Sequence, residues 1–393
     1  MNGKAYPVVD DLSFTESGLF YKLVSRLNLG GTSTKHITKR ILFMIAITWL
    51  PLLVLTALQG LAFGNKVDVP FWKDFSTHSK LLIILPLLLF AEGSFDFRLK
   101  ELTIQFFKSG ILNEKDFGSF EEIKKKVKGL CDSIWPDIIM ILIILINVLL
   151  RAYSLRADKI SIWIFLPDQS NASISWAGLY MAIISLAFIQ FLILRWLWRW
   201  LIWFIYFRKL ARLSLKLNSA HPDMAGGLGF LGYPPGPFIQ VVFAVAVLFS
   251  TAIAENIYFL HEMLQTYFPV IAVFAVLSIL LNIMPLLVFL KPLATQRRKG
   301  IFEYSALIQE HHRQFDEKWL RSPHESALPG VADASSMTDF NSSFDVVKKM
   351  KLVPYDIKIM VSSILIAILP ILPLLAFEYN IMDLILKVLK MLV

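Results

Sequence analysis

Cysteine and charge are both scarce in this sequence. Cys131 is the single cysteine in 393 residues, so the chain can form neither an internal disulfide nor a cysteine-based metal cluster. Charged residues make up 18% of the chain and hydrophobic residues 56%. An average soluble domain has about 25% charged and roughly 45–50% apolar residues. A soluble fold has too little interior for this apolar excess, which indicates burial in lipid.

From the sequence we expect no cleavable signal peptide. The residues before Ile41 are of mixed polarity, and the first long apolar run begins only there. We therefore expect that run to serve as the insertion signal.

Long apolar runs, by contrast, are frequent. A helix needs about 20 residues to cross a hydrocarbon core about 30 Å thick. The candidate runs cover residues 41–63, 81–97, 137–153, 175–207, 238–261, 268–290 and 359–377. They are apolar on every face, whereas transmembrane strands alternate apolar and polar residues. We predict an all-α, polytopic integral membrane protein with about seven transmembrane helices and a range of six to eight.

Two of these runs are the least regular. Residues 81–97 are short for a span and contain Glu92. Residues 359–377 contain Pro370 and Pro373 and are followed by another apolar stretch, so that residues 359–393 form either one span or a hairpin.

Basic residues alternate between the segments that connect the runs. Alternate segments, beginning with the N-terminal one, carry 29 Lys and Arg residues, and the intervening segments carry five. The positive-inside rule then predicts a cell-membrane protein, inner or plasma membrane, with a cytoplasmic N-terminus. The expected partners are the lipid bilayer and its anionic headgroups. Topology accounts for the net charge of +9, so nucleic acid is not expected as a partner, and a homo-oligomer stays open.

This topology divides the chain into four parts. They are a cytoplasmic N-terminal segment (1–40), a bundle with a cytoplasmic loop at 92–136 (41–290), a cytoplasmic helix plus flexible loop (291–358) and a C-terminal span with an apolar tail (359–393). Residues 19–27 have the spacing of an amphipathic helix, lying either on the inner leaflet or on the protein's own loops. A second amphipathic helix is expected at 301–321, and the turn-forming composition of 322–345 predicts a flexible loop.

Four ionisable residues stand out within the predicted spans. They are Glu92, Arg151, Arg195 and Glu255. A charge in hydrocarbon costs at least a few kcal/mol unless it is partnered or hydrated. Depth along the spans matches Arg151 with Glu255 near the outer side and Arg195 with Glu92 near the inner side. Such pairs either line a polar cavity or serve as structural ion pairs and snorkelling residues.

Polar residues and intramembrane charges together favour a transporter or channel for a small solute or ion. Asn147, Gln190, Asn256 and Asn282 are the polar residues expected near its pathway. The alternative is a membrane-embedded scaffold or sensor that acts through its cytoplasmic loops. A lipid-modifying enzyme stays a third option, although the pair His221 and Asp223 beside a span does not make a catalytic constellation. We expect no enzyme activity, no cofactor and no metal.

A glycine-rich connector at residues 221–238 contains the pattern G-x-G-x-x-G. A dinucleotide site needs a strand before these glycines and a helix opening on them, but prolines follow instead and a predicted span comes next. We interpret the connector as a re-entrant or interfacial turn. Its candidate hinge residues are Gly226, Gly227, Gly229 and Gly232, and Pro285 inside the sixth run is another.

Overall fold

The structure is a computed structural model that describes residues 12–154, 162–166, 173–232, 238–321 and 331–378. Helices account for 77% of it, and the described residues contain no strand. The predicted all-α class is confirmed.

Five helical stretches in the described part of the chain are long and apolar enough to cross a membrane. They are Thr34–Leu58, Phe117–Leu150, Trp176–Leu210, Phe238–Leu260 and Leu264–Arg321. Each one contains or overlaps one of the predicted runs. The count is therefore five, and seven spans are not confirmed.

Of the two remaining runs, the one at residues 81–97 contains Glu92 and Asp96, and the one at residues 359–377 lies in a shorter helix. Residues 81–97 lie inside a helix that continues through α4 (Phe75–Ser79), η2 (Lys80–Ile84) and α5 (Leu85–Lys108). The last run is interrupted at its prolines, between α14 (Ile357–Ile368) and α15 (Leu375–Glu378).

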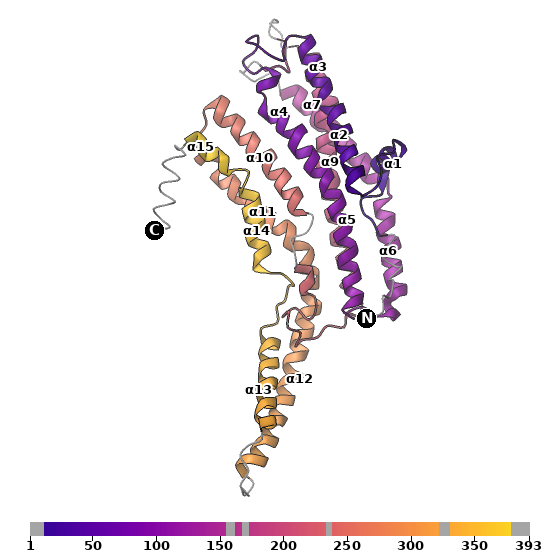
Figure 1. The fold of residues 1–393 in the computed structure, drawn as a ribbon, viewed down its shortest axis with the longest axis vertical. Helices are drawn as coiled ribbons and strands as arrows, with labels where there is room; N and C mark the ends of the chain where they lie inside the picture. The colour runs from indigo at the N-terminus through magenta and orange to yellow at the C-terminus, as the bar shows by residue number, and fades with distance from the viewer. Residues whose placement is uncertain (1–11, 155–161, 167–172, 233–237, 322–330, 379–393) are drawn as a thin grey trace.

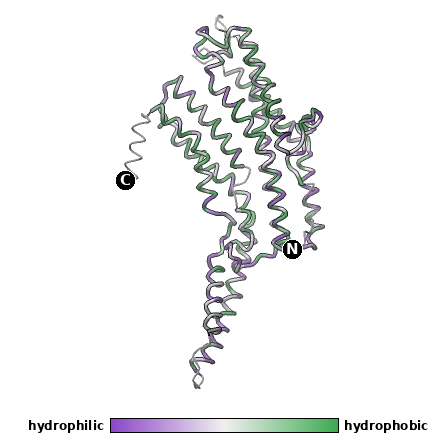
Figure 2. The backbone as a smooth tube through the Cα atoms, in the orientation of Figure 1, coloured by the Kyte–Doolittle hydropathy of each residue, from purple (hydrophilic) through white to green (hydrophobic). Residues whose placement is uncertain are grey.

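Two long, uninterrupted helices lie next to each other in the middle of the bundle (Figure 1). One is the α4–α5 helix, and the other runs through α8 (Trp176–Tyr180), η5 (Met181–Ser185) and α9 (Leu186–Leu210). On one side lie α1 (Gly18–Arg26), α2 (Thr34–Thr48), α3 (Leu50–Leu58), α6 (Phe117–Cys131) and α7 (Trp135–Ser154). On the other side lie α10 (Phe238–Leu260), α11 (Phe268–Ile283) and α14. Figure 2 shows that hydrophobic residues dominate this bundle.

Aromatic side chains form much of the main core. The ring of Phe95 on α5 lies 5.7 Å from Trp196, 5.4 Å from Trp203 and 5.5 Å from Phe238, between ring centroids. Helix α1 adds Phe20 and Val24 to this core and leaves Leu23 exposed, so it packs on the protein through one face.

Two helices bend at prolines, and the α8–α9 helix contacts both bends. A proline at position i cannot donate to the carbonyl of residue i−4. Pro51 thus leaves the carbonyl of Ile47 free, and the hydroxyl of Tyr180 donates to it at 2.8 Å. Pro285 begins the 3-10 segment η8 (Met284–Phe289) and leaves the carbonyl of Leu281 free.

The indole nitrogen of Trp200 donates to that carbonyl at 2.7 Å. The candidate hinge at Pro285 is therefore a bend, and Trp200 bonds the carbonyl that the proline leaves without a helical donor. Its role as a hinge stays a prediction.

Helices α12 (Leu290–Asp316) and α13 (Val331–Lys348) form a hairpin that extends beyond one end of the bundle (Figure 1). The prediction of a flexible loop at 322–345 is wrong for residues 331–345, which belong to α13. The glycine and the prolines of the segment 322–345 all precede Val331, so no helix breaker lies within α13. Packing on α12, where the His311 and Phe340 rings lie 4.9 Å apart, supplies the support that the sequence pattern does not reveal.

Candidate functional site

Glu92 on α5 is the centre of a group of buried charges. Its carboxylate forms ion pairs with Arg40 of α2 and with Arg199 of α9, where Nη2 lies 2.7 Å from Oε1. All three side chains are at most 5% exposed. Arg40 also donates to the carbonyl of Gly31 at 2.7 Å. Three helices are thus joined through one carboxylate.

Glu92 and Arg195 do not form the predicted pair by direct contact, although their charges lie near enough to interact. Arg195 donates instead to the carbonyl oxygens of Thr15 and Ser17, at 3.2 and 3.1 Å, and lies over the ring of Phe20 at 4.7 Å. Arg195 and Arg199 are four residues apart on one helix, so they lie on the same face one turn apart. Depth along the span could not tell which of them reaches Glu92.

A segment near the N-terminus enters the bundle beside these charges. Asp96, one turn beyond Glu92, accepts hydrogen bonds from Ser13, from Thr15 and from the amide of Phe14 at 3.0 Å. Asp137 of α7 accepts from the amide of Leu19 at 3.0 Å. The carboxylates therefore hold a segment that was expected on the cytoplasmic surface.

We call these side chains the buried charge cluster; its members are Arg40, Glu92, Asp96, Asp137, Arg195 and Arg199. It contains three bases and three acids, and each side chain belongs to a residue that is at most 7% exposed. The formal charges balance when all six groups are ionised.

Hydrogen-bond donors in the cluster are incompletely used. Within the described residues, Nε and Nη1 of Arg199 have no hydrogen-bond partner, and Nη2 meets Glu92 at ion-pair distance without hydrogen-bond geometry. Nη1 of Arg195 and Nε of Arg40 also have none. Buried polar groups normally find partners, so each unused donor marks a place where an acceptor could bind.

The four predicted pathway amides lie in three other places. Gln190 donates to Asn147 at 3.2 Å, between α9 and α7. Asn256 donates to the hydroxyl of Tyr267 at 2.7 Å. Asn282 of α11 donates to Ser363 of α14 at 3.2 Å. Each amide joins two neighbouring segments of the bundle and bonds outside the charge cluster.

The second predicted ion pair stays a prediction. Glu255 is half-buried on α10, and the side chain of Arg151 lies outside the described part of the structure.

The glycine connector has its own acid. The carboxylate of Asp223 accepts from the amides of Ala225, Gly227 and Gly229 at 2.8, 3.1 and 2.7 Å. Burial alone would raise the pKa of Asp223, but these three hydrogen bonds, together with His221, hold it below its usual value. A phosphate would need the same amides, so the chain's own carboxylate fills the place of an anion.

The connector packs on protein along its described part. Leu228 and Leu231 are 0% and 7% exposed and belong to the main core, with the Phe230 ring 5.1 Å from that of Phe106. Gly226 and Gly227 have φ of +67° and +95°, which side chains rarely adopt.

The other two hinge glycines lie in close packing. A Cβ on Gly229 would lie 2.8 Å from the side chain of Asp223, and one on Gly232 would lie 2.6 Å from the carbonyl oxygen of Pro354. Whether the four glycines act as a hinge stays a prediction.

The acid and histidine beside the fourth span do lie together. Nδ1 of His221 is 2.8 Å from Oδ1 of Asp223. That carboxylate already accepts three amides, so it supports the turn. Among the described residues, no group of three His, Cys, Asp or Glu side chains could hold a metal ion.

Sequence reasoning missed four of the six members of the charge cluster. Arg40 and Asp137 stood at the edges of predicted spans, and Asp96 and Arg199 lay inside runs without being singled out. The i, i+4 spacing of Glu92 with Asp96 and of Arg195 with Arg199 was the available signal, because it puts two charges on one buried face.

Comparisons with known proteins add no relative. No protein-family model, no curated protein and no solved structure matches this chain.

Proposed function

We propose that this chain is a membrane transporter or channel for a small anionic solute, and that the buried charge cluster is part of its polar path. The observation that carries the proposal is the environment of Arg199. Its guanidinium is buried between helices, meets one carboxylate and has donors without partners.

A buried arginine with unused donors is energetically costly. Removing an ion from water costs several kcal/mol, and a partner compensates fully only when the remaining donors are also satisfied. An anion or a chain of water molecules would supply the missing acceptors. Glu92 would then alternate with the solute as the partner of Arg199, which gives binding and release without leaving the arginine unpaired.

The proposal includes seven spans and a cytoplasmic N-terminus in a cell membrane. The helix from Phe75 to Lys108 is about 50 Å long at about 1.5 Å per residue, which exceeds a hydrocarbon core of about 30 Å. Helices α14 and α15 form the seventh crossing, and the alternation of basic residues gives the orientation.

The single cysteine makes this topology testable. In a Cys131→Ser background, Lys66→Cys should react with a membrane-impermeant maleimide on intact cells, and Lys349→Cys should react only after permeabilisation. The reverse pattern would contradict the orientation.

Flux into proteoliposomes tests the transport proposal. Vesicles containing the purified protein should take up chloride, phosphate or a small carboxylate faster than empty vesicles. Arg199→Gln should abolish uptake and Arg199→Lys should retain part of it, because lysine keeps the charge but not the guanidinium geometry.

The matched control is Arg313→Gln on the exposed face of α12, which should leave flux unchanged. Size-exclusion profiles establish that each variant is folded. A folded wild-type protein with no flux of any of these anions would contradict the proposal.

A second candidate function is a scaffold or sensor that acts through the α12–α13 hairpin. The hairpin extends away from the bundle (Figure 1). Three large apolar side chains are exposed on it, namely Phe302, Leu307 and Leu320, at 65%, 48% and 72%. Replacing residues 301–348 with a short flexible linker distinguishes the two functions. Intact flux would assign the hairpin a separate role, whereas lost flux in a folded variant would make it part of transport.

A further inference from the structure

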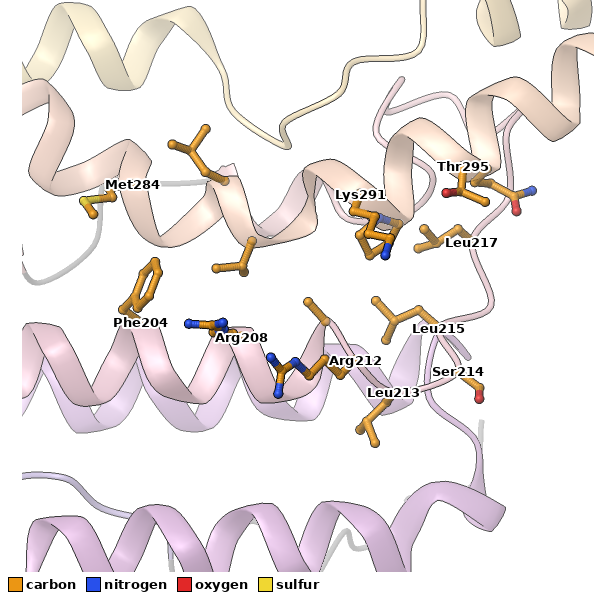
Figure 3. A pocket seen from close by; sticks show the side chains of 15 residues that line it. Phe204, Arg208, Arg212, Leu213, Ser214, Leu215, Leu217, Met284, Lys291 and Thr295 are labelled. Atoms are coloured by element: carbon orange, nitrogen blue, oxygen red, sulfur yellow. The ribbon is translucent and has the colours of Figure 1, made fainter.

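A groove lies between the end of α9 and the start of α12, next to the hairpin (Figure 3). Its volume is about 880 Å³, within the roughly 300–1,000 Å³ that is typical of small-molecule sites. Its walls come from α9, from the segment at residues 211–217 that follows it, and from η8 and α12.

One part of the groove is strongly basic. Arg208, Arg212 and Lys291 line it, and all three are exposed. None of its lining residues is acidic. Within the described part of the chain, no carboxylate pairs with any of the three. Three positive charges thus line one groove without an acidic partner among the described residues, which favours an anionic ligand.

The other part of the groove is apolar. Phe204 precedes Arg208 by one turn of α9, and Met284 and Leu287 precede Lys291 on the facing segment. In Figure 3, Phe204 and Met284 face each other at one end, and Thr295 lies at the opposite end. The end at Phe204 and Met284 therefore offers hydrocarbon contacts, and the basic side chains follow along the groove, where Leu215 and Leu217 also line the wall.

The combination of basic and apolar walls sets the chemistry of the ligand. A free phosphate ion would use the basic part and leave the apolar walls exposed to water. A phospholipid would use both parts, because its phosphate and its acyl chains are joined in the same order. The basic part begins where the apolar run of α9 ends, after Phe207, at the level that headgroups occupy beside a transmembrane helix.

We propose that this groove binds an anionic phospholipid. Its phosphate lies among Arg208, Arg212 and Lys291, and an acyl chain follows Phe204, Met284 and Leu287. The hydroxyl of Thr295 and the amide of Gln296 line the same groove and can bond headgroup oxygens. Met284 and Leu287 belong to η8, so the bend at Pro285 shapes the apolar wall. The site is independent of the proposed transport path.

Native mass spectrometry of the full-length protein tests this site. The protein is titrated with phosphatidylglycerol, with phosphatidylcholine of the same chains and with inorganic phosphate. We expect phosphatidylglycerol to be retained more tightly than phosphatidylcholine, and phosphate not to be retained. The triple variant R208Q/R212Q/K291Q should weaken phosphatidylglycerol retention about 100-fold, because each basic group near an anionic headgroup contributes roughly a factor of five.

Two further variants separate this site from general attraction and from misfolding. R298Q/K299Q/R313Q removes the same charge from the rest of α12 and should change retention less than twofold, on the order expected for a distant charge. M284Q/L287Q keeps the charge and should weaken lipid retention. Equal losses in the two triple variants would overturn the proposal, and so would tight binding of phosphate alone.

Discussion

The indole nitrogen of Trp200 lies 2.7 Å from the carbonyl oxygen of Leu281, the carbonyl that Pro285 leaves without a helical donor. The hydroxyl of Tyr180 has the same relationship to the carbonyl of Ile47, four residues before Pro51. Both donors belong to the α8–α9 helix. One straight helix thus satisfies the bends of two neighbours, which fixes their angles relative to it.

Removing the Trp200 donor should destabilise the bend. We expect Trp200→Phe to lower the free energy of unfolding by about 1–2 kcal/mol, because it leaves a carbonyl without a partner in an apolar setting. Trp198→Phe is the matched control. Thermal unfolding of the purified protein measures both.

A double-mutant cycle then tests the cause of that loss. In a Pro285→Ala background the helical donor returns, so Trp200→Phe should cost markedly less there. An equal cost in both backgrounds would show that Trp200 acts through packing alone.

Neutralising the centre of the charge cluster should be costly. Glu92→Gln leaves Arg40 and Arg199 buried without their carboxylate, and loss of one partner of a buried pair costs about 3–5 kcal/mol. Glu121→Gln removes a half-exposed pair with Lys124 and should cost at most about 1 kcal/mol. Midpoints of thermal unfolding compare the two variants, and similar shifts would contradict a special role for the cluster.

The turn held by Asp223 should depend on pH in one direction. The pKa of Asp223 is below its usual value in the folded protein, so its ionised form stabilises the turn above the ordinary pKa of about 3.9. That contribution is lost as the pH falls through the lowered folded pKa. Asp223→Asn should remove the dependence and expose the turn at neutral pH.

Hydrogen exchange of the amides of Ala225, Gly227 and Gly229 measures this effect. Protection that is equal in the wild type and in Asp223→Asn at neutral pH would mean that the carboxylate does not hold the turn.

Substitution of the glycines tests the hinge. Gly227 has φ of +95°, so alanine there is strained, and we expect a loss of about 1–2 kcal/mol. In Gly229→Ala the new Cβ would press on Asp223, 2.8 Å away. Flux and unfolding are measured together for both variants. Unchanged folding with unchanged flux would contradict a functional hinge, and loss of flux in a folded variant would support it.

Much of the helical framework followed from local sequence. Apolar runs without alternation predicted helices, and five of them contain or overlap stretches that are apolar enough to cross a membrane. Proline positions predicted bends, because the missing amide acts on its own helix. Residues 331–345 were assigned wrongly because their helix lacks an apolar stripe and depends on α12 for support.

The sequence by itself determined that the protein is helical, rich in membrane-length apolar segments and free of internal disulfides, since these properties follow from composition and local pattern. Only the tertiary structure decided which partners the charges have. Glu92 meets Arg199 rather than Arg195, and Asp96 holds Thr15, because helix rotation and chain return bring together residues far apart in sequence. The amides of the glycine pattern are likewise taken by Asp223, which only the folded turn brings within reach.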